Sequence, residues 1–399
     1  MRDSTLPASK GAFESAVNQH RAGNLDAAEK GYRSILQQQP DNVDALHMLG
    51  MIAYQRGRHD AALKLIAEAL RYSPSSSAIY VNLGSVYVAN GQPDAAISAL
   101  DKAIALNPAT AMAYNCLGNA YRMKGLEKET IDAYRKAIAT DPAFTDAYAN
   151  LGTVYYKNDR LDEAKQCFQK TVELNPEHSS AIHMLASLNG NTTETAPLDH
   201  VRQLFDEYSG NFDKHLVEEL GYSMPELIRT EMGRIAGPDT IFRNAIDIGC
   251  GTGLAGAQFR PVAQRLTGVD ASVRMVEKAK DRNVYDSLHA GDAIEYLENS
   301  GEHYDLFVCA DVFPYIGNIY PLFRSVKKYA EAGAYFTFST EAAEESGYVL
   351  RKTGRYAHSS NYIKEVAADA GFSVLTLRRE NLRRQRGNWI PGDLVVLRL

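Results

Sequence analysis

The stretch Asn244-Ala-Ile-Asp-Ile-Gly-Cys-Gly-Thr-Gly253 decides the fold of the C-terminal half of the chain. Residues 245–248 are apolar and partly β-branched apart from Asp247, which predicts a short buried strand. Three glycines follow at alternate positions, and a helix-like run begins after them. Glycine lets the backbone adopt positive φ and approach a ligand closely. A strand, a glycine-rich turn and a helix N-terminus together predict a nucleotide-binding site, with the kind of nucleotide left open.

Length and composition predict an ordinary globular protein of two or three domains. The chain has 399 residues, of which 45% are hydrophobic and 23% charged. The net charge of −6 gives no bulk attraction to nucleic acid or to an anionic membrane, so neither is expected as a partner. The sequence has no apolar run of 18 residues and no apolar segment of a secretory signal near its start. We therefore expect a cytoplasmic protein.

Four scattered cysteines support the same compartment. They have no C-x-x-C spacing and each falls in a predicted helix, strand or tight turn: Cys116, Cys167, Cys250 and Cys309. We interpret them as reduced residues and expect neither disulfides nor a metal site.

The first half of the chain is a repeat array. Prolines recur every 34 residues, at Pro40, Pro74, Pro108, Pro142 and Pro176. Leu-Gly pairs recur at the same period, at Leu49-Gly50, Leu83-Gly84, Leu117-Gly118 and Leu151-Gly152. So strict a period indicates repeated structural units. These residues resemble the tetratricopeptide repeat, as five units over about 9–178 with a capping helix beyond. The resemblance implies an all-α solenoid that occupies residues 9–190.

Two functions are open for the array. Such solenoids present a concave groove, and groove-facing asparagines could bind a peptide or protein backbone, because an amide both donates and accepts. The candidates are Asn82, Asn115, Asn119 and Asn150. The alternative is a spacer or a homodimerisation module with polar surface asparagines.

Residues 191–199 are small and polar, which predicts a linker before a second domain at 200–399. Apolar residues with helical spacing follow at Val201, Leu204 and Phe205, until residues 208–213 interrupt the pattern. The segment 200–236 resembles the N-terminal helical lid of many class I methyltransferases. In those proteins aromatic residues cover the cofactor and shape the substrate pocket. The resemblance implies Tyr208, Phe212 and His215 as lid residues, although Phe205 and Phe212 also fit a purely packing role.

Strands and helices alternate along the second domain. The predicted strands are 245–248, 265–270, 285–289, 304–310, 334–339, 372–377 and 393–399. This alternation predicts a parallel sheet covered by helices on both faces.

Two nucleotides compete for the glycine turn. Gly251-x-Gly253-x-x-Gly256 matches the dinucleotide fingerprint, with Asp270 at a suitable distance for a ribose contact. Two acids argue against NAD. Asp247 lies inside the strand where that motif usually has an apolar residue, and Asp292 follows the third strand, where an adenine amino group could be held.

The ordered series of glycines and acids resembles the class I S-adenosylmethionine-dependent methyltransferases over about 200–399. The resemblance implies a Rossmann-like seven-stranded sheet whose last strand is antiparallel, with S-adenosyl-L-methionine as the cofactor and S-adenosyl-L-homocysteine as the product. The implied cofactor-binding residues are Asp247, Gly249, Cys250, Gly251, Gly253, Asp270, Ala271, Asp292, Ala293, Asp311 and Val312. Among them Asp270 would accept both ribose hydroxyls and Asp292 would read the adenine, while helix capping is the simpler role for either acid alone.

The methyl acceptor is less well defined. Ligands of such a sheet lie at the C-terminal ends of its strands, so the loops 311–318, 341–359 and 378–392 matter. They contain an arginine-rich stretch and the single tryptophan, which favour an anionic acceptor. We predict His358, Tyr315 and Asp311 as catalytic residues, with His358 as the base because its pKa can be near neutrality. The predicted substrate-binding residues are Tyr208, Phe212, His215, Arg355, Tyr356, Arg384 and Trp389.

Three hypotheses follow. The chain is a methyltransferase whose repeats recruit a protein, or a small-molecule methyltransferase whose repeats serve assembly. The third is an interaction scaffold that binds the cofactor without turnover. An NAD-dependent oxidoreductase is the weakest alternative.

Overall fold

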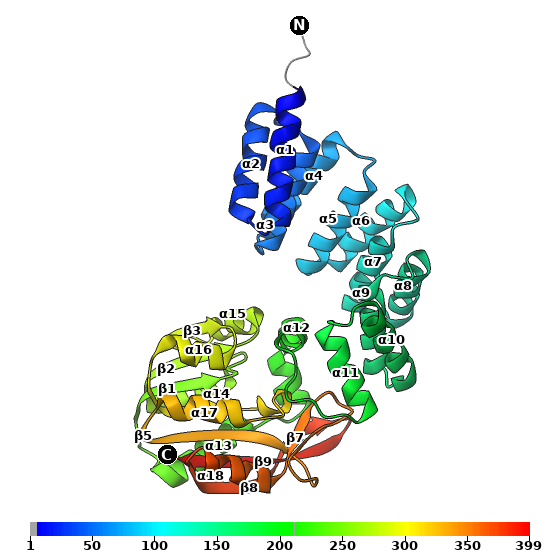
Figure 1. Ribbon diagram of the computed structural model, residues 1–399. Coiled ribbons are helices and arrows are strands. Elements are labelled where there is room, and N and C mark those ends of the chain that lie inside the picture. Colours follow the sequence, from blue (N-terminus) through cyan, green and yellow to red (C-terminus); the bar gives the residue numbers. More distant parts are fainter. Residues whose placement is uncertain (1–5, 211) are drawn as a thin grey trace. The chain divides into compact units, whose positions relative to one another are not determined.

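The computed structural model describes residues 6–210 and 212–399, and it divides into two compact units at Pro176 and Glu177. Within the described residues, the first unit consists of helices and the second contains a sheet with helices on both faces (Figure 1). No helix in either described range is long and apolar enough to cross a membrane.

The described part of the first unit is a series of ten helices. They are α1 Leu6–Arg21, α2 Leu25–Gln38, α3 Val43–Gln55, α4 His59–Tyr72, α5 Ser77–Ala89, α6 Pro93–Leu106, α7 Ala111–Met123, α8 Glu127–Thr140, α9 Thr145–Lys157 and α10 Leu161–Leu174. Glycine at the Leu-Gly slots lets the two helices of a pair pack closely. A Cβ added at Gly84 would lie 2.5 Å from Leu100 Cγ, and one added at Gly118 would lie 2.4 Å from Tyr134 Cε1. The period of the sequence therefore reflects the regular packing of paired helices, as expected for a repeat array.

The second unit begins with four helical segments before its sheet. They are α11 Ser179–Asn189, α12 Leu198–Tyr208, the π-helix η1 Lys214–Glu219 and α13 Met224–Ala236. Part of the segment 191–199, predicted as a linker, packs against this unit: Thr195 forms a β-bridge with Ile316, and Ala196 is buried. The capping helix α11 also contacts the unit, since Ser187 Oγ donates to Arg351 O at 2.7 Å.

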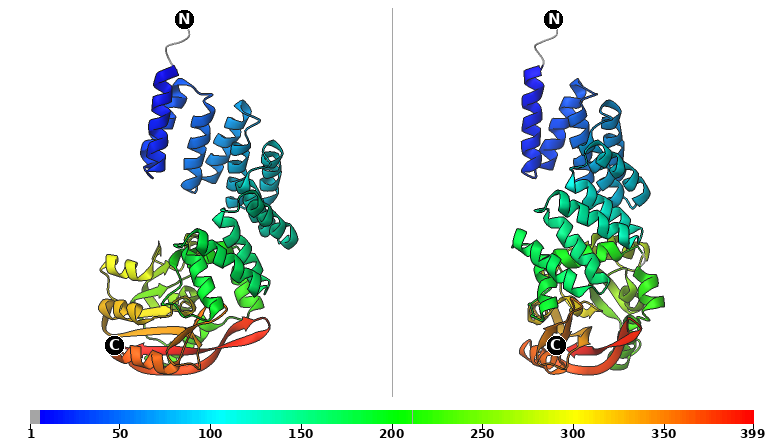
Figure 2. Two further views of the ribbon diagram at one scale, coloured as in Figure 1. Left: turned by 45° about the vertical axis from the view of Figure 1, so that its right-hand side comes forward. Right: turned by 90° about the vertical axis from the view of Figure 1, so that its right-hand side faces the viewer.

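The sheet has the order β3-β2-β1-β4-β5-β9-β8, with β6 and β7 attached to the end of β5. Its strands are β1 Phe242–Ile248, β2 Ala263–Asp270, β3 Ser287–Ala290, β4 Tyr304–Cys309, β5 Ala330–Ala342, β6 Tyr348–Leu350, β7 Tyr356–His358, β8 Ser373–Gln385 and β9 Asn388–Arg398. The strands β1 to β5 are parallel and β9 is antiparallel to β5. β9 pairs with β5 and β8 with β9, and in the left view of Figure 2 the red strands lie beside the orange β5. The predicted sheet with an antiparallel last strand is confirmed.

Two hydrophobic cores cover the two faces of the sheet. The connecting helices are α14 Leu254–Phe259, α15 Val273–Asp281, α16 Ala293–Ser300, α17 Tyr320–Tyr329 and α18 Ser360–Asp369, with short 3-10 turns η2 Arg260–Val262 and η3 Phe313–Tyr315. Apolar residues of α16, α17 and α18 form one core and those of α13 and α14 the other (Figure 1). Both faces of the sheet are covered by apolar side chains of the helices, which explains why the strands are apolar along most of their length.

Two predicted loops are wrong in part. Residues 341–359 contain the antiparallel hairpin β6–β7. Residues 378–392 belong almost entirely to the β8–β9 hairpin, whose ladder continues to the pair Gln385 and Asn388. Polar and charged residues made these stretches resemble loops. They form strands because the neighbouring strands satisfy their backbone hydrogen bonds.

Candidate functional site

The glycine turn follows β1 and requires glycine at each of its three positions. The φ angles are +67° at Gly249, +53° at Gly251 and +90° at Gly253, a region that other residues rarely adopt. Space is also restricted, since a Cβ at Gly249 would lie 2.2 Å from Val312 Cγ2. At the ends of β1 and β4, Val312 therefore lies against Gly249, and both are predicted cofactor-binding residues.

Asp270 ends β2 and is tied to the glycine turn. Its Oδ2 accepts from Gly251 N at 2.8 Å, and its Oδ1 accepts from Ser272 N at 2.8 Å. Burial raises the pKa of Asp270 to about 6, although the two backbone hydrogen bonds act in the opposite direction. The carboxylate thus links the turns after β1 and β2, and Ala271 lies in the second of these turns, between Asp270 and Ser272 in the chain.

Asp247 lies inside β1 and has one free oxygen. Tyr285 donates to its Oδ2 at 2.6 Å, whereas the buried Oδ1 has no hydrogen-bond partner among residues 6–210 and 212–399. Burial raises the pKa of Asp247 to about 7, with a smaller contribution from Asp270. A buried carboxylate oxygen without a donor is costly, so it indicates a position where a donor on a ligand would be stabilised.

Asp292 and Ala293 lie at the same edge of the sheet. Gly291 N donates to Asp270 O at 2.8 Å, which places the start of α16 beside the end of β2. Asp292 caps that helix through Oδ1, which accepts from Ile294 N and Glu295 N at 2.9 Å each. Asp292 therefore fills the simpler of its two predicted roles, as the cap of α16.

The predicted lid aromatics form a cluster next to the glycine turn. Phe212 Cε1 lies 4.0 Å from the position of a Cβ on Gly251. The ring of Tyr208 meets Phe212 at 5.5 Å and His215 at 5.2 Å between centroids. Phe205 continues the cluster, because its ring lies 5.2 Å from Tyr315 in the loop after β4. The structure thus brings the predicted lid residues and Phe205 to both the glycine turn and the loop after β4.

Asp311 belongs to a network of charges after β4. Arg383 donates to Asp311 Oδ1 at 2.6 Å and to Glu341 Oε1 at 2.5 Å, with only 3% of its side chain exposed. Arg355 lies 3.9 Å from the same Glu341 oxygen. Burial alone would lower the pKa of Arg355, but the carboxylates of Glu341 and Asp311 and a hydrogen bond to Tyr315 outweigh burial and raise it.

His358 does not join this network. It is fully buried, and its Nε2 lies 2.9 Å from Ile316 O and 3.0 Å from Gly317 O, so that nitrogen carries the hydrogen. Burial lowers the pKa of His358 to about 4. The imidazole therefore supports the loop after β4 in its neutral form.

The remaining predicted substrate residues have local partners. Tyr356 is buried with its hydroxyl 2.5 Å from Thr193 Oγ1. Arg384 stacks on Trp389 at 4.9 Å, and both side chains are exposed. Other members of the arginine-rich stretch pair with acids: Arg378 with Glu231 and Glu380, and Arg379 with Asp393. The sequence prediction did not include Tyr285, Glu341 and Arg383, whose partners are distant in the chain.

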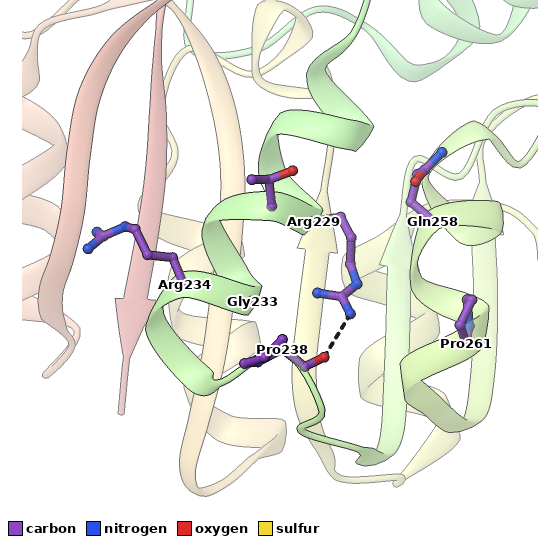
Figure 3. Close-up of a pocket in the computed structure, with 7 residues that line it drawn as sticks. Arg229, Gly233, Arg234, Pro238, Gln258 and Pro261 are labelled. Atoms are coloured by element: carbon purple, nitrogen blue, oxygen red, sulfur yellow. Dashed lines mark hydrogen bonds between the residues drawn. The ribbon is translucent and has the colours of Figure 1, made fainter.

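One surface pocket lies elsewhere. Figure 3 shows it between α13 and the end of α14, lined by Arg229, Thr230, Gly233, Arg234, Pro238, Gln258 and Pro261. Pro238 precedes β1 and Pro261 precedes β2, so the pocket is at the N-terminal ends of the strands. The residues described above gather at the C-terminal ends, where parallel sheets bind their ligands. We place the functional site there. Among residues 6–210 and 212–399, no group of three or more His, Cys, Asp or Glu residues could hold a metal ion.

Family models match both halves of the chain. Models described as tetratricopeptide repeat match residues 16–77, 53–117 and 145–178, and a model described as methyltransferase domain matches residues 246–336. The chain is a tetratricopeptide-repeat protein with a methyltransferase domain. The methyltransferase match runs from β1 to β5 and includes the glycine turn, Asp270, Asp292 and Asp311. It indicates an S-adenosylmethionine-dependent enzyme.

Solved structures resemble one half or the other. A MamA protein is 31% identical, covering 42% of this chain and 92% of its own, with a TM-score of 0.36. A thermophilic tetratricopeptide-repeat protein from Thermus thermophilus is 23% identical, covering 45% and 98%, with a TM-score of 0.41. Magnesium protoporphyrin IX methyltransferase from Synechocystis PCC 6803, with bound S-adenosylhomocysteine, is 14% identical, covering 50% and 98%, with a TM-score of 0.39. A search of curated proteins finds no match.

Proposed function

We propose that the methyltransferase domain holds S-adenosylmethionine at the C-terminal ends of β1, β2 and β3 and methylates a carboxylate. The bridge made by Asp270 between Gly251 N and Ser272 N carries the cofactor part of the proposal, because it builds a rigid recess from two turns. The residues present fit this cofactor. The orphan oxygen of Asp247 suits an ammonium group, and the glycine turn admits a ligand close to its backbone.

Each residue has a part in holding the cofactor. Asp247 and the turn 249–251 would face its amino-acid end, Asp270 its ribose and Asp292 with Ala293 its adenine. When bound, the cofactor would supply a methyl group activated by sulfonium: a lone pair on the acceptor would attack the methyl carbon, and S-adenosylhomocysteine would leave. The protein then has to align the acceptor and exclude water. The aromatic cluster of Phe205, Tyr208 and Phe212 suits the exclusion of water, since it lies between the turn and the loop after β4.

Arg355 is the residue that best suits an anionic acceptor. Its only ion pair among the described residues is a long one of 3.9 Å to Glu341, whose Oε1 already accepts from Arg383. Part of its side chain, 27%, stays exposed although neighbouring groups surround it. A guanidinium has five donors in a planar fork that matches a carboxylate. Arg355 would therefore bind the acceptor and orient it beside Asp311.

A carboxylate acceptor also agrees with the lack of a base at this position. His358 is buried and its Nε2 donates to backbone carbonyls, so we do not give it the role of base. Asp311 is held by Arg383. An alcohol would have to lose a proton, whereas a carboxylate is already ionised at neutral pH and needs no base.

Calorimetry tests the cofactor. The full chain should bind S-adenosylmethionine and S-adenosylhomocysteine and should not bind NAD. If the protein bound NAD but neither S-adenosylmethionine nor S-adenosylhomocysteine, the NAD-dependent oxidoreductase would become the favoured hypothesis.

A labelled-methyl assay tests the acceptor. Lysate treated with the protein and methyl-tritiated S-adenosylmethionine should give a product that loses its label as volatile methanol in mild alkali, because methyl esters hydrolyse there. Arg355→Gln should abolish the labelling, and Arg324→Gln, which changes an exposed arginine on α17 that is not among the predicted site residues, should not. A base-stable label would exclude the carboxylate, and no label in any fraction would favour the scaffold hypothesis.

The repeat array would recruit the acceptor or its carrier, because tetratricopeptide repeats mediate protein interactions. Several of the predicted asparagines already have partners inside the array: Asn82 contacts His47 at 2.7 Å, Asn150 donates to Asn115 at 3.0 Å and Asn119 accepts from Tyr134 at 2.6 Å. Deleting residues 1–176, which leaves α11 in place, should weaken methylation of a protein acceptor. Undiminished labelling would favour assembly as the role of the repeats.

A further inference from the structure

Three polar groups join the lid segment to the glycine turn. Thr252 donates its hydroxyl hydrogen to Asp213 Oδ1, and Arg282 donates from Nη2 to Asp213 Oδ2. Arg282 Nε also donates to Thr252 O at 2.6 Å. Each of the three residues thus contacts the other two. We call this set, Asp213, Thr252 and Arg282, the latch.

The latch is adjacent to the residues that would enclose the cofactor. Asp213 directly follows Phe212, and Thr252 directly follows Gly251; Phe212 Cε1 lies 4.0 Å from the position of a Cβ on Gly251. Arg282 closes the turn from outside, since its Cδ lies 2.9 Å from the position of a Cβ on Gly253. Holding Asp213 therefore holds the aromatic ring of Phe212 over the glycine turn.

The two ends of the lid have separate anchors. On its N-terminal side, Ser272 Oγ donates to Asp206 Oδ1 at 2.5 Å. On its C-terminal side, Leu216 is buried and Leu220 O accepts from Arg384 N at 2.7 Å. Phe212 and Asp213 lie between these anchors. Release of the latch would therefore free Phe212 and Asp213 while the two anchors stay in place.

The exposure of the latch suits a contact that opens and closes. The side chain of Asp213 is 44% exposed and that of Arg282 is 29% exposed. Water and salt reach such an ion pair, so its strength is moderate and depends on ionic strength. A fully buried pair, such as Arg383 with Glu341, would be too costly to break in every cycle.

We infer that Asp213 and Arg282 are positioning residues that set the rate at which cofactor and product leave the site. The inference rests on the proposed function, because it presumes S-adenosylmethionine under Phe212. Neither residue touches the reacting atoms. They act through Phe212 and the glycine turn, so their effect belongs to ligand exchange and not to the chemical step.

The test follows the release of radiolabelled S-adenosylhomocysteine from the full-length protein after a chase with unlabelled ligand. Asp213→Asn removes the charge at nearly constant size and should speed release about fivefold, the order expected for a partly exposed charge-assisted contact. Arg282→Gln should have the same effect, and the double variant should release no faster than either single variant, because both single variants break the same Asp213–Arg282 ion pair. The matched control is Asp199→Asn, an acid on α12 that pairs with Arg202 and lies outside the latch. It should release at the wild-type rate.

Salt provides a measurement that needs no variant. Release from the wild-type protein should quicken between low and high salt as the exposed pair is screened, which guards against a variant that folds poorly. A folded Asp213→Asn protein with wild-type release, or wild-type release that ignores salt, would overturn the latch. A wild-type protein that binds no S-adenosylhomocysteine would instead overturn the proposed function.

Discussion

Tyr285 donates its hydroxyl hydrogen to Asp247 across 2.6 Å, and its ring fills the space left by three glycines. A Cβ added at Gly256 would lie 2.2 Å from the Tyr285 hydroxyl, and those at Gly253 and Gly268 would lie within 3.1 Å of the ring. Gly256 is thus required by the tyrosine. It is the third glycine of the apparent dinucleotide fingerprint, so its presence here has a packing cause that is independent of NAD.

The same pair predicts how ligand affinity depends on pH. Burial raises the pKa of Asp247 to about 7, so in the ligand-free protein this carboxyl group is partly protonated near neutral pH. The ammonium group of S-adenosylhomocysteine would favour the ionised form of Asp247, so binding would release the proton from its carboxyl group. Affinity should therefore rise between about pH 6 and pH 8, and calorimetry in buffers of different ionisation enthalpy should detect the released proton.

Two variants check that assignment. Tyr285→Phe removes a hydrogen bond that lowers the pKa of Asp247, so the rise in affinity should move to higher pH. Asp247→Asn should bind weakly with little dependence on pH over the same range. A wild-type pH profile in Asp247→Asn would mean that another group carries the proton.

Asp270→Ala should reduce the affinity for S-adenosylhomocysteine by about 10- to 100-fold. It removes an acceptor for the ribose and also leaves Gly251 N and Ser272 N without their partner, each a charge-assisted hydrogen bond of about 1.5–3 kcal/mol. Calorimetry measures the loss. Asp286→Ala, an acid that pairs with Arg260 at the opposite end of β2, is the control and should bind normally. Undiminished binding by Asp270→Ala would refute the ribose assignment.

The sequence predicted the repeat array, the sheet and the glycine turn because each depends on short-range pattern. The period of 34 residues records helix packing, and Asp270 is placed by the strand that it ends. The same approach could not find Glu341 and Arg383, which are 42 residues apart and meet only across the sheet. Contacts of this kind depend on strand order, which a single sequence does not specify.

Arg383 illustrates a second limit of prediction from the sequence alone. The sequence prediction chose its neighbour Arg384 as substrate-binding, yet Arg383 is buried and Arg384 exposed. Simple alternation along a strand would place Leu382 and Arg383 on opposite faces. The ladder shifts register between Asn381 and Arg383, and both Leu382 and Arg383 are buried. Such a bulge has no dependable sequence signal, because any residue type can occupy it.

Arg383→Met should destabilise the second unit by about 3–5 kcal/mol, since it leaves Asp311 and Glu341 without their buried cation. Arg384→Met should cost less than about 1 kcal/mol, because it removes only an exposed contact with Trp389. Denaturant unfolding followed by tryptophan fluorescence measures both, as the single tryptophan reports on this unit alone. Equal losses in the two variants would contradict the burial difference between these arginines.

His358 predicts a loss of stability in mild acid. Burial lowers its pKa to about 4 in the folded protein, whereas the unfolded chain has a pKa of about 6.5. The unfolded state therefore gains a proton first as the pH falls below about 6.5, and this group's contribution declines until the pH reaches about 4. The raised pKa values of Asp247 and Asp270 act in the opposite direction, so the histidine is isolated by comparing wild type with His358→Gln. Between about pH 7 and pH 5 the unfolding free energy of wild type should fall relative to that variant by about 2 kcal/mol. Denaturant unfolding at the two pH values gives the difference, and a gap that does not change would mean that His358 is already charged or exposed in the folded protein.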